Sequence, residues 1–134
     1  YLLNKDTQKD SLPLRLQAFE RMTLFLERIN PGKLLIRISP NSEDKNDYVN
    51  LLISNIEQEF EHNLTQQIYM SDECWTVIVT SKNATIQMIR RTNMSDSVET
   101  ANNLREEIMN DLMDKQSPSS VALSYIKNEV KYLF

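Results

Sequence analysis

The sequence predicts an all-α fold, an irregular bundle of four to five helices with one extended crossover at about residues 31–46. Three observations support this class. The 134 residues include one glycine, Gly32, whereas tight β-hairpins depend on glycine at positive φ. Apolar side chains recur at helical spacing through most of the chain. The length suits one domain with a sizeable core that needs neither a disulfide nor a metal.

Local start and stop signals place the elements in chain order. Residues 1–11 are polar and largely aperiodic, so they are expected to be disordered or the stub of a helix, and 12–134 form a single helical domain. Pro13 suits a first helical turn, and the pair Pro31-Gly32 is a strong stop signal. The helices are expected over 12–30, 47–69, 71–93, 95–116 and 117–134.

The segment after the first helix is expected to be extended. Residues 33–39 alternate weakly, with Leu34, Ile36 and Ile38 on one side. A single strand in a helical domain has no ladder partner, so the segment is predicted to cross over the helices and to continue into a loop at 40–46.

Helical wheels at about 100° per residue place charged side chains where apolar ones are expected. These residues are Arg15, Glu59, Lys82, Arg105 and Glu129. Two interpretations stay open. The cations can snorkel to the rim of the core, or the five groups can form a partly buried ion-pair network, because unpaired charges in a low dielectric are costly. In the network, Glu59 and Glu129 each pair with one of the three cations.

The composition argues against catalysis and against nucleic-acid binding. A chain with one glycine holds no Walker loop, dinucleotide fingerprint or nucleophile elbow. The lone Cys74 cannot form an intrachain disulfide, which fits a reducing compartment, and is expected to fill space in the core. The net charge is −4, and the one basic cluster is small: Lys82, Arg90 and Arg91. The chain is therefore predicted not to be an enzyme and to have no nucleic-acid partner.

One spacing resembles a metal motif. Glu59 and His62 are separated as in the E-x-x-H motif of di-iron bundles, but those sites need the motif on two helices, and this chain has one histidine. We therefore expect a surface histidine, with no metal and no cofactor. The alternative is a metal- or small-molecule-binding bundle centred on Glu59 and His62, which a polar cavity beside His62 would favour.

The end of the chain is rich in large apolar groups. If Tyr125, Tyr132, Leu133 and Phe134 do not fold back on the first helix, they form a partner surface. The first helix also carries two apolar stripes, which permits a homo-oligomer as well as packing from two sides within one chain.

Four segments resemble an uncharacterised family of short bacterial helical proteins. They are residues 12–21 (LPLRLQAFER), 24–31 (LFLERINP), 57–64 (EQEFEHNL) and 122–129 (ALSYIKNE). The resemblance implies an N-terminal membrane span followed by a basic stretch, neither of which this sequence contains. Basic residues directly after a first span place the following domain in the cytoplasm. The expected function is thus a non-enzymatic scaffold or adaptor domain, tethered to the cytoplasmic face of the bacterial inner membrane, with a protein partner.

Overall fold

The computed structural model describes the backbone of residues 2–133 and the side chains of 11–113 and 115–133. Over these residues the chain is all-α, as predicted. The elements are α1 (Leu2–Ile29), α2 (Pro31–Arg37), α3 (Lys45–His62), the 3-10 helix η1 (Leu64–Tyr69), α4 (Asp72–Asn93), α5 (Ala101–Asp114) and α6 (Pro118–Lys131).

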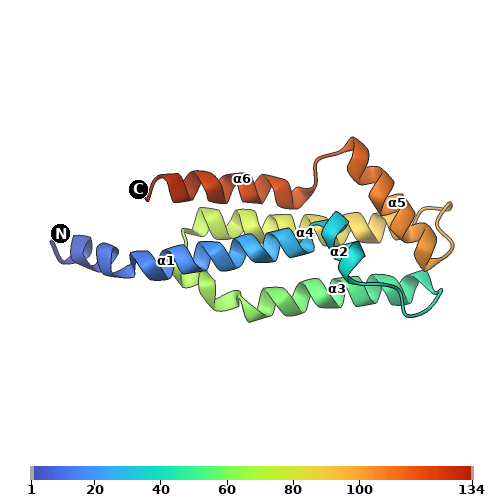
Figure 1. The fold of residues 1–134 in the computed structure, drawn as a ribbon, viewed down its shortest axis with the longest axis horizontal. Coiled ribbons are helices and arrows are strands. Elements are labelled where there is room, and N and C mark those ends of the chain that lie inside the picture. The colour runs from blue at the N-terminus through green and yellow to red at the C-terminus, as the bar shows by residue number, and fades with distance from the viewer. Residues whose placement is uncertain (1, 134) are drawn as a thin grey trace.

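Four helices, α1, α3, α4 and α6, run side by side along the long axis of the molecule (Figure 1). Helix α6 packs along both α4 and α1, and α3 packs on α4. Helices α2 and α5 contact each other at one end of this bundle, and α5 also contacts α3 and α4. Helix α1 begins and helix α6 ends toward the opposite end (Figure 1). We call the end that carries α2 and α5 the closed end of the bundle.

The predicted extended crossover is wrong for residues 31–37, which form α2. The Asn30 side chain accepts a hydrogen bond from the Gly32 amide at 3.1 Å, and Pro31 occupies the first turn. An asparagine cap followed by proline starts a new helix directly after the stop. Leu34 and Leu35 are consequently buried, whereas Ile36 is 76% exposed.

The predicted fourth helix also starts too early. Helix α5 begins at Ala101, because the Thr100 hydroxyl accepts a hydrogen bond from the Asn103 amide at 3.2 Å and caps it. Residues 94–100 form a loop instead, which Lys45 holds in place. The end of the predicted second helix is the 3-10 turn η1, whereas the predicted starts of α4 and α6 hold.

The core receives side chains from all six α-helices and runs along the whole bundle. Its largest fully buried side chains are Tyr48, Phe25, Met22, Leu26, Ile29, Leu34, Leu52, Ile56, Ile78, Ile89, Leu104 and Ile108. A domain of this length buries about two thirds of its unfolded surface, so such a core is sufficient to hold the fold.

Cations from neighbouring elements satisfy carbonyl groups at the ends of three helices. The donors and acceptors are Arg37 to the Arg28 carbonyl at 3.2 Å, Arg105 to the Leu35 carbonyl at 2.9 Å, and Lys45 to the Asn93 carbonyl at 2.8 Å. Helices commonly end instead on a glycine at positive φ, and the described part of the chain contains no residue at positive φ. Lysine and arginine side chains thus bind the free carbonyl groups at these helix ends, as glycine-based caps do in other helices.

Removing one buried hydroxyl group on α4 is expected to stabilise the fold. Ser81 is 5% exposed, and its Oγ atom has no hydrogen-bond partner among the residues that the structure describes. Ser81→Ala is expected to raise the free energy of unfolding by about 1 kcal/mol, because an unsatisfied buried donor is removed and alanine favours the helix. Urea denaturation measures the change. Thr85→Val is the matched control, since the Thr85 hydroxyl donates to the Ser81 carbonyl at 2.9 Å; equal destabilisation of both variants would contradict the prediction.

Candidate functional site

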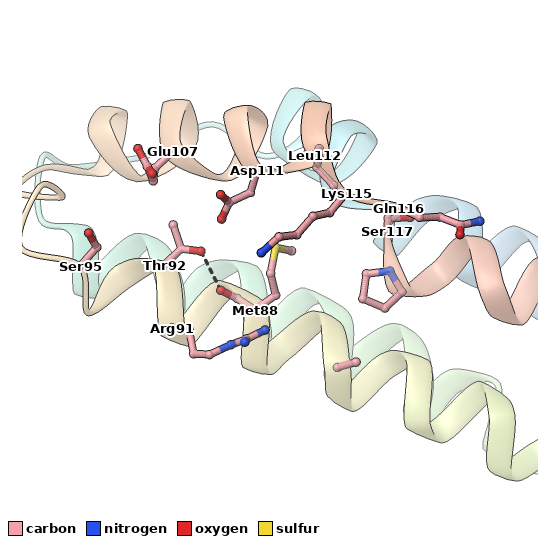
Figure 2. A pocket seen from close by; sticks show the side chains of 12 residues that line it. Met88, Arg91, Thr92, Ser95, Glu107, Asp111, Leu112, Lys115, Gln116 and Ser117 are labelled. Carbon is pink, nitrogen blue, oxygen red and sulfur yellow. Dashed lines mark hydrogen bonds between the residues drawn. The ribbon is translucent and has the colours of Figure 1, made fainter.

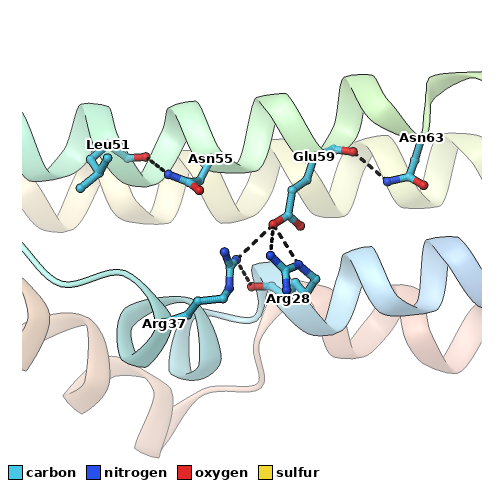
Figure 3. Close-up of polar contacts among 6 residues, drawn as sticks. All are labelled: Arg28, Arg37, Leu51, Asn55, Glu59 and Asn63. Carbon is cyan, nitrogen blue, oxygen red and sulfur yellow. Dashed lines mark hydrogen bonds and ion pairs between the residues drawn. The ribbon is translucent and has the colours of Figure 1, made fainter.

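The predicted pairing of the inward-facing charges is wrong, because Glu59 has different partners. Its Oε1 atom lies 2.7 Å from Nη2 of Arg28 and 3.4 Å from Nη2 of Arg37. Both guanidinium groups converge on this carboxylate, one from α1 and one from α2 (Figure 3). Glu59 therefore joins three helices. A helical wheel shows that Glu59 lies at the margin of α3, but it does not show which helix lies opposite.

Lys82 is almost buried, and it pairs with Glu57 rather than with Glu59. Its Nζ atom lies 3.2 Å from Glu57 and 4.4 Å from the centre of the Phe60 ring, and the residue is 8% exposed. Phe60 in turn contacts the rings of Phe25 and Trp75. The ammonium group is thus held between a carboxylate and an aromatic face, two environments that favour a cation. This contact holds α4 against α3.

Arg105 is satisfied by an oxygen of the backbone. Its guanidinium donates to the Leu35 carbonyl at 2.9 Å and lies near the Tyr48 hydroxyl. The Tyr48 hydroxyl also donates to the Ile38 carbonyl at 2.6 Å. Burial raises the pKa of Tyr48, and the Arg105 charge opposes that rise. Arg105 therefore connects α5 to α3 and to the end of α2.

The remaining two predicted charges form no ion pair with the side chains that the structure describes. Glu129 is half-buried on α6; partial burial and the neighbouring Glu129 carboxylate both raise the pKa of Tyr125. Arg15 is half-buried on α1. The five residues therefore do not assemble into one network, and each contact acts locally.

The Glu59 and His62 pair lines an open hollow of about 520 Å³ between α1 and α3. His62 is exposed, and Glu59 is already bound by two guanidinium groups. No group of three metal-ligating side chains occurs among the described residues. A polar hollow beside His62 is thus present, but its carboxylate is engaged in joining helices.

The predicted C-terminal partner surface is largely folded back. Tyr125 and Leu133 pack against the core, in keeping with the contact of α6 with α1, whereas Tyr132 is 88% exposed. Phe134 lies outside the described residues. Of the four predicted positions, Tyr132 is the one that the structure shows to be largely open to solvent.

A different apolar surface lies at the closed end of the bundle. We call it the α2–α5 surface and define it by three exposed side chains: Ile36 (76% exposed), Met109 (41%) and Met113 (85%). Ile36 and Met109 line one hollow of about 420 Å³, together with Leu35, Asn102, Arg105, Glu106 and Asn110. Helix α2 lies close against α5 here, since a Cβ on Gly32 would be 3.9 Å from a methyl group of Leu112.

This surface was not predicted, because residues 31–37 were expected to be extended. In a strand, Ile36 shares a side with Leu34 and Ile38; in a helix at about 100° per residue it lies on the opposite side from both. The cap-and-proline start at Asn30 was the signal that could have revealed the helix.

A second hollow, of about 400 Å³, separates α5 from α4. Glu107 and Asp111 enter it from α5, Arg91 enters it from α4, and Lys115 extends across it toward Met88 (Figure 2). Helix α5 therefore has a hollow on each side, and most of its outer face is free of other helices.

Burial keeps the one cysteine protonated. Cys74 is fully buried, which raises the pKa of its thiol from 9.0 to about 11, and Glu129 adds to the effect. A thiol in this state is a poor nucleophile at neutral pH. Cys74 therefore acts as a small apolar residue of the core.

The raised thiol pKa predicts a loss of stability in alkali. Between pH 9 and 11 the unfolded chain releases the Cys74 proton while the folded chain keeps it, so the free energy of unfolding falls as pH rises. Urea titrations at several pH values measure the slope, and Cys74→Ala should make it shallower over this window. The raised pKa of Tyr48 leaves some slope of the same sign. An unchanged slope in Cys74→Ala would contradict the prediction.

Together, the core shared by the six α-helices and the exposed apolar side chains of α2 and α5 define a helical-bundle domain. A family model matches residues 1–133, and the chain belongs to that family, DUF7935, a family of unknown function. Membership of an uncharacterised family is as predicted. No curated protein and no solved structure matches the chain. Among the described helices, none combines the length and apolar character needed to cross a membrane.

Proposed function

We propose that this chain is a non-catalytic adaptor domain that binds a segment of a partner protein at the α2–α5 surface. One observation carries the proposal: Ile36, Met109 and Met113 are exposed together at one end of a bundle whose core is otherwise filled. Neighbouring exposed apolar side chains mark interaction sites, and methionine adapts its shape to different partners.

The positions of the charged residues support the same function. Glu59, Lys82 and Arg105 each connect two or more helices, so their unusual placement has a structural explanation. The Cys74 thiol is buried and protonated. Ile36 and Met113, in contrast, are mostly exposed and therefore add little to the packing of the described bundle.

The proposal includes a tether at the cytoplasmic face of the bacterial inner membrane. Its support is the resemblance of residues 12–21, 24–31, 57–64 and 122–129 to proteins with an N-terminal span. The full-length protein is therefore expected in the membrane fraction of its host, to resist extraction with high salt and to dissolve in detergent. Recovery in the salt extract would overturn the tether and leave the adaptor function to be judged separately.

Site-specific photocrosslinking in the host cell tests the adaptor function. A photoreactive phenylalanine derivative is placed at Met109 or Met113, and at Gln87, an exposed position on α4, as the matched control. We expect adducts of the same masses from both methionine positions and none of them from Gln87. Excess unlabelled domain should compete, and the same domain carrying Ile36→Asp should not.

Two outcomes would overturn this function. Equal adducts from Gln87 would show that the contacts are unspecific. An adduct of twice the mass of the chain, with no other, would show that the surface joins two copies of the chain and not a separate partner.

A further inference from the structure

We infer that the hollow between α4 and α5 binds a small zwitterion with an apolar body, of the size of an apolar amino acid or of a dipeptide with free termini. This hollow lies on the other side of α5 from the α2–α5 surface, so the inference does not depend on the adaptor function. It rests on how the charged side chains are separated across the hollow, on their lack of ion-pair partners and on the apolar part of the lining.

Two neighbouring carboxylates lie on the α5 side of the hollow. Glu107 and Asp111 are four residues apart, so they lie on the same face of this helix, and both are half-buried. Like charges at this spacing repel each other, and neither carboxylate forms an ion pair with a side chain that the structure describes. This side of the hollow can therefore accept hydrogen bonds from a positively charged group.

Two cations lie on the opposite side, toward α4. Lys115 follows Asp111 by four residues, a spacing that favours an ion pair within one continuous helix. Helix α5 ends at Asp114, however, and the Lys115 side chain extends across the hollow toward Met88 (Figure 2). Arg91 lies three residues after Met88, on the same face of α4. This side of the hollow can therefore donate hydrogen bonds to an anionic group.

The two sides do not neutralise each other. Within the described part of the chain, no nitrogen of Arg91 or Lys115 lies within 4 Å of a carboxylate oxygen. Carboxylates accept hydrogen bonds from an ammonium group, and a guanidinium group can bind a carboxylate through two parallel hydrogen bonds. A ligand that carries one ammonium and one carboxylate group can therefore match both sides, whereas a simple anion or cation matches one.

The rest of the lining indicates the body of the ligand. The hollow has a volume of about 400 Å³, which suits a small molecule, and part of its lining is apolar. The apolar residues are Ala84, Met88, Leu112 and Pro118. The described lining contains no aromatic ring, whereas quaternary ammonium groups are bound in aromatic cages. We therefore expect an ammonium group with N–H donors and an apolar side chain on the ligand.

Calorimetric titration of the intact chain tests the inference. The probes are leucine and the dipeptide leucyl-leucine. Each is compared with its N-acetyl form, which has no ammonium group, with its amide, which has no carboxylate, and with its glycine counterpart, which has no apolar body. At least one probe should bind saturably, with one site per chain, at concentrations up to about 10 mM. Its three matched compounds should bind about tenfold more weakly, because each lacks one of the contacts.

Matched variants locate the binding. Glu107→Gln and Arg91→Gln should each weaken binding of the probe about tenfold, because each removes one charged partner of the ligand. Glu106→Gln and Arg90→Gln make the same charge changes at adjacent exposed residues outside the hollow and should change the affinity less than about twofold. Since Glu107 and Arg91 hold no described ion pair, their variants should keep the circular dichroism spectrum and the thermal midpoint of the parent chain.

Three outcomes would overturn the inference. They are the lack of saturable binding by either probe, equal binding of the N-acetyl form or the amide, and equal weakening by the control variants. The adaptor function is judged separately, because photocrosslinks at Met109 can persist when the hollow binds neither probe. Conversely, the absence of those crosslinks would leave binding in the hollow unaffected.

Discussion

Replacing Tyr48 by alanine is expected to lower the free energy of unfolding by about 4 kcal/mol. The residue is 1% exposed, and its ring lies among the largest side chains of the core. Its removal leaves a cavity at the point where α3 meets α5 and the end of α2. Chemical denaturation in urea measures the loss, and a smaller denaturant midpoint with an unchanged slope is the expected form of the result.

Tyr48→Phe is the control that separates the ring from the hydroxyl group. This variant keeps the ring and removes the hydrogen bond that the hydroxyl donates to the Ile38 carbonyl. We expect it to lower the free energy of unfolding by about 1–2 kcal/mol, since a buried acceptor loses its partner. If Tyr48→Phe and Tyr48→Ala were equally destabilised, the packing of the ring would contribute nothing, contrary to its burial.

Glu59→Ala is expected to have the second large effect, lowering the free energy of unfolding by about 2–3 kcal/mol. The Glu59 side chain is 19% exposed, and its carboxylate accepts from Arg28 at 2.7 and 2.9 Å and lies 3.4 Å from Arg37. Hydrogen bonds to charged groups contribute more than neutral ones, and removing the acid leaves two cations near each other. The loss should therefore exceed that of an exposed ion pair.

Two further variants test this assignment. Glu61→Ala, on the exposed side of the same helix, should change stability by less than about 0.5 kcal/mol. A double-mutant cycle between Glu59→Ala and Arg28→Ala should give a coupling energy of about 1 kcal/mol or more. A cost for Glu59→Ala no larger than that for Glu61→Ala would show that the three-helix junction adds no stability.

The starts of α4 and α6 were predictable from their capping residues. Ser71 accepts from the Cys74 amide at 3.1 Å, and Ser117 precedes the proline that opens α6, as the sequence indicates. The start of α2 was missed because Pro31 and Gly32 serve both as an end and as a beginning. The start of α5 was missed because Ser95 is as good a cap by type as Thr100, and the loop before α5 is held by a contact from Lys45, far away in sequence.

The candidate site, too, has features that were predictable from the sequence and features that were not. Helical periodicity alone indicated that Glu59, Lys82 and Arg105 lie among apolar neighbours, and the structure explains each of them by a contact. Periodicity did not indicate the partners of these charges, which include Arg28, Arg37 and Glu57, because a helical wheel describes one helix and an ion pair joins two. Periodicity also did not predict the exposure of Met109, since that exposure depends on where α2 ends.

The sequence by itself determined the helical class, the starts of α4 and α6 and the presence of charges near the core, because propensity, capping and periodicity act within a few residues. Only the tertiary structure decided which groups the charged side chains contact. With one glycine, the chain lacks the residue that most often ends helices at positive φ, and cations from neighbouring elements bind the exposed carbonyls of α1, α2 and α4 instead. Such contacts join residues as far apart as Leu35 and Arg105, so they exist only once the helices have packed.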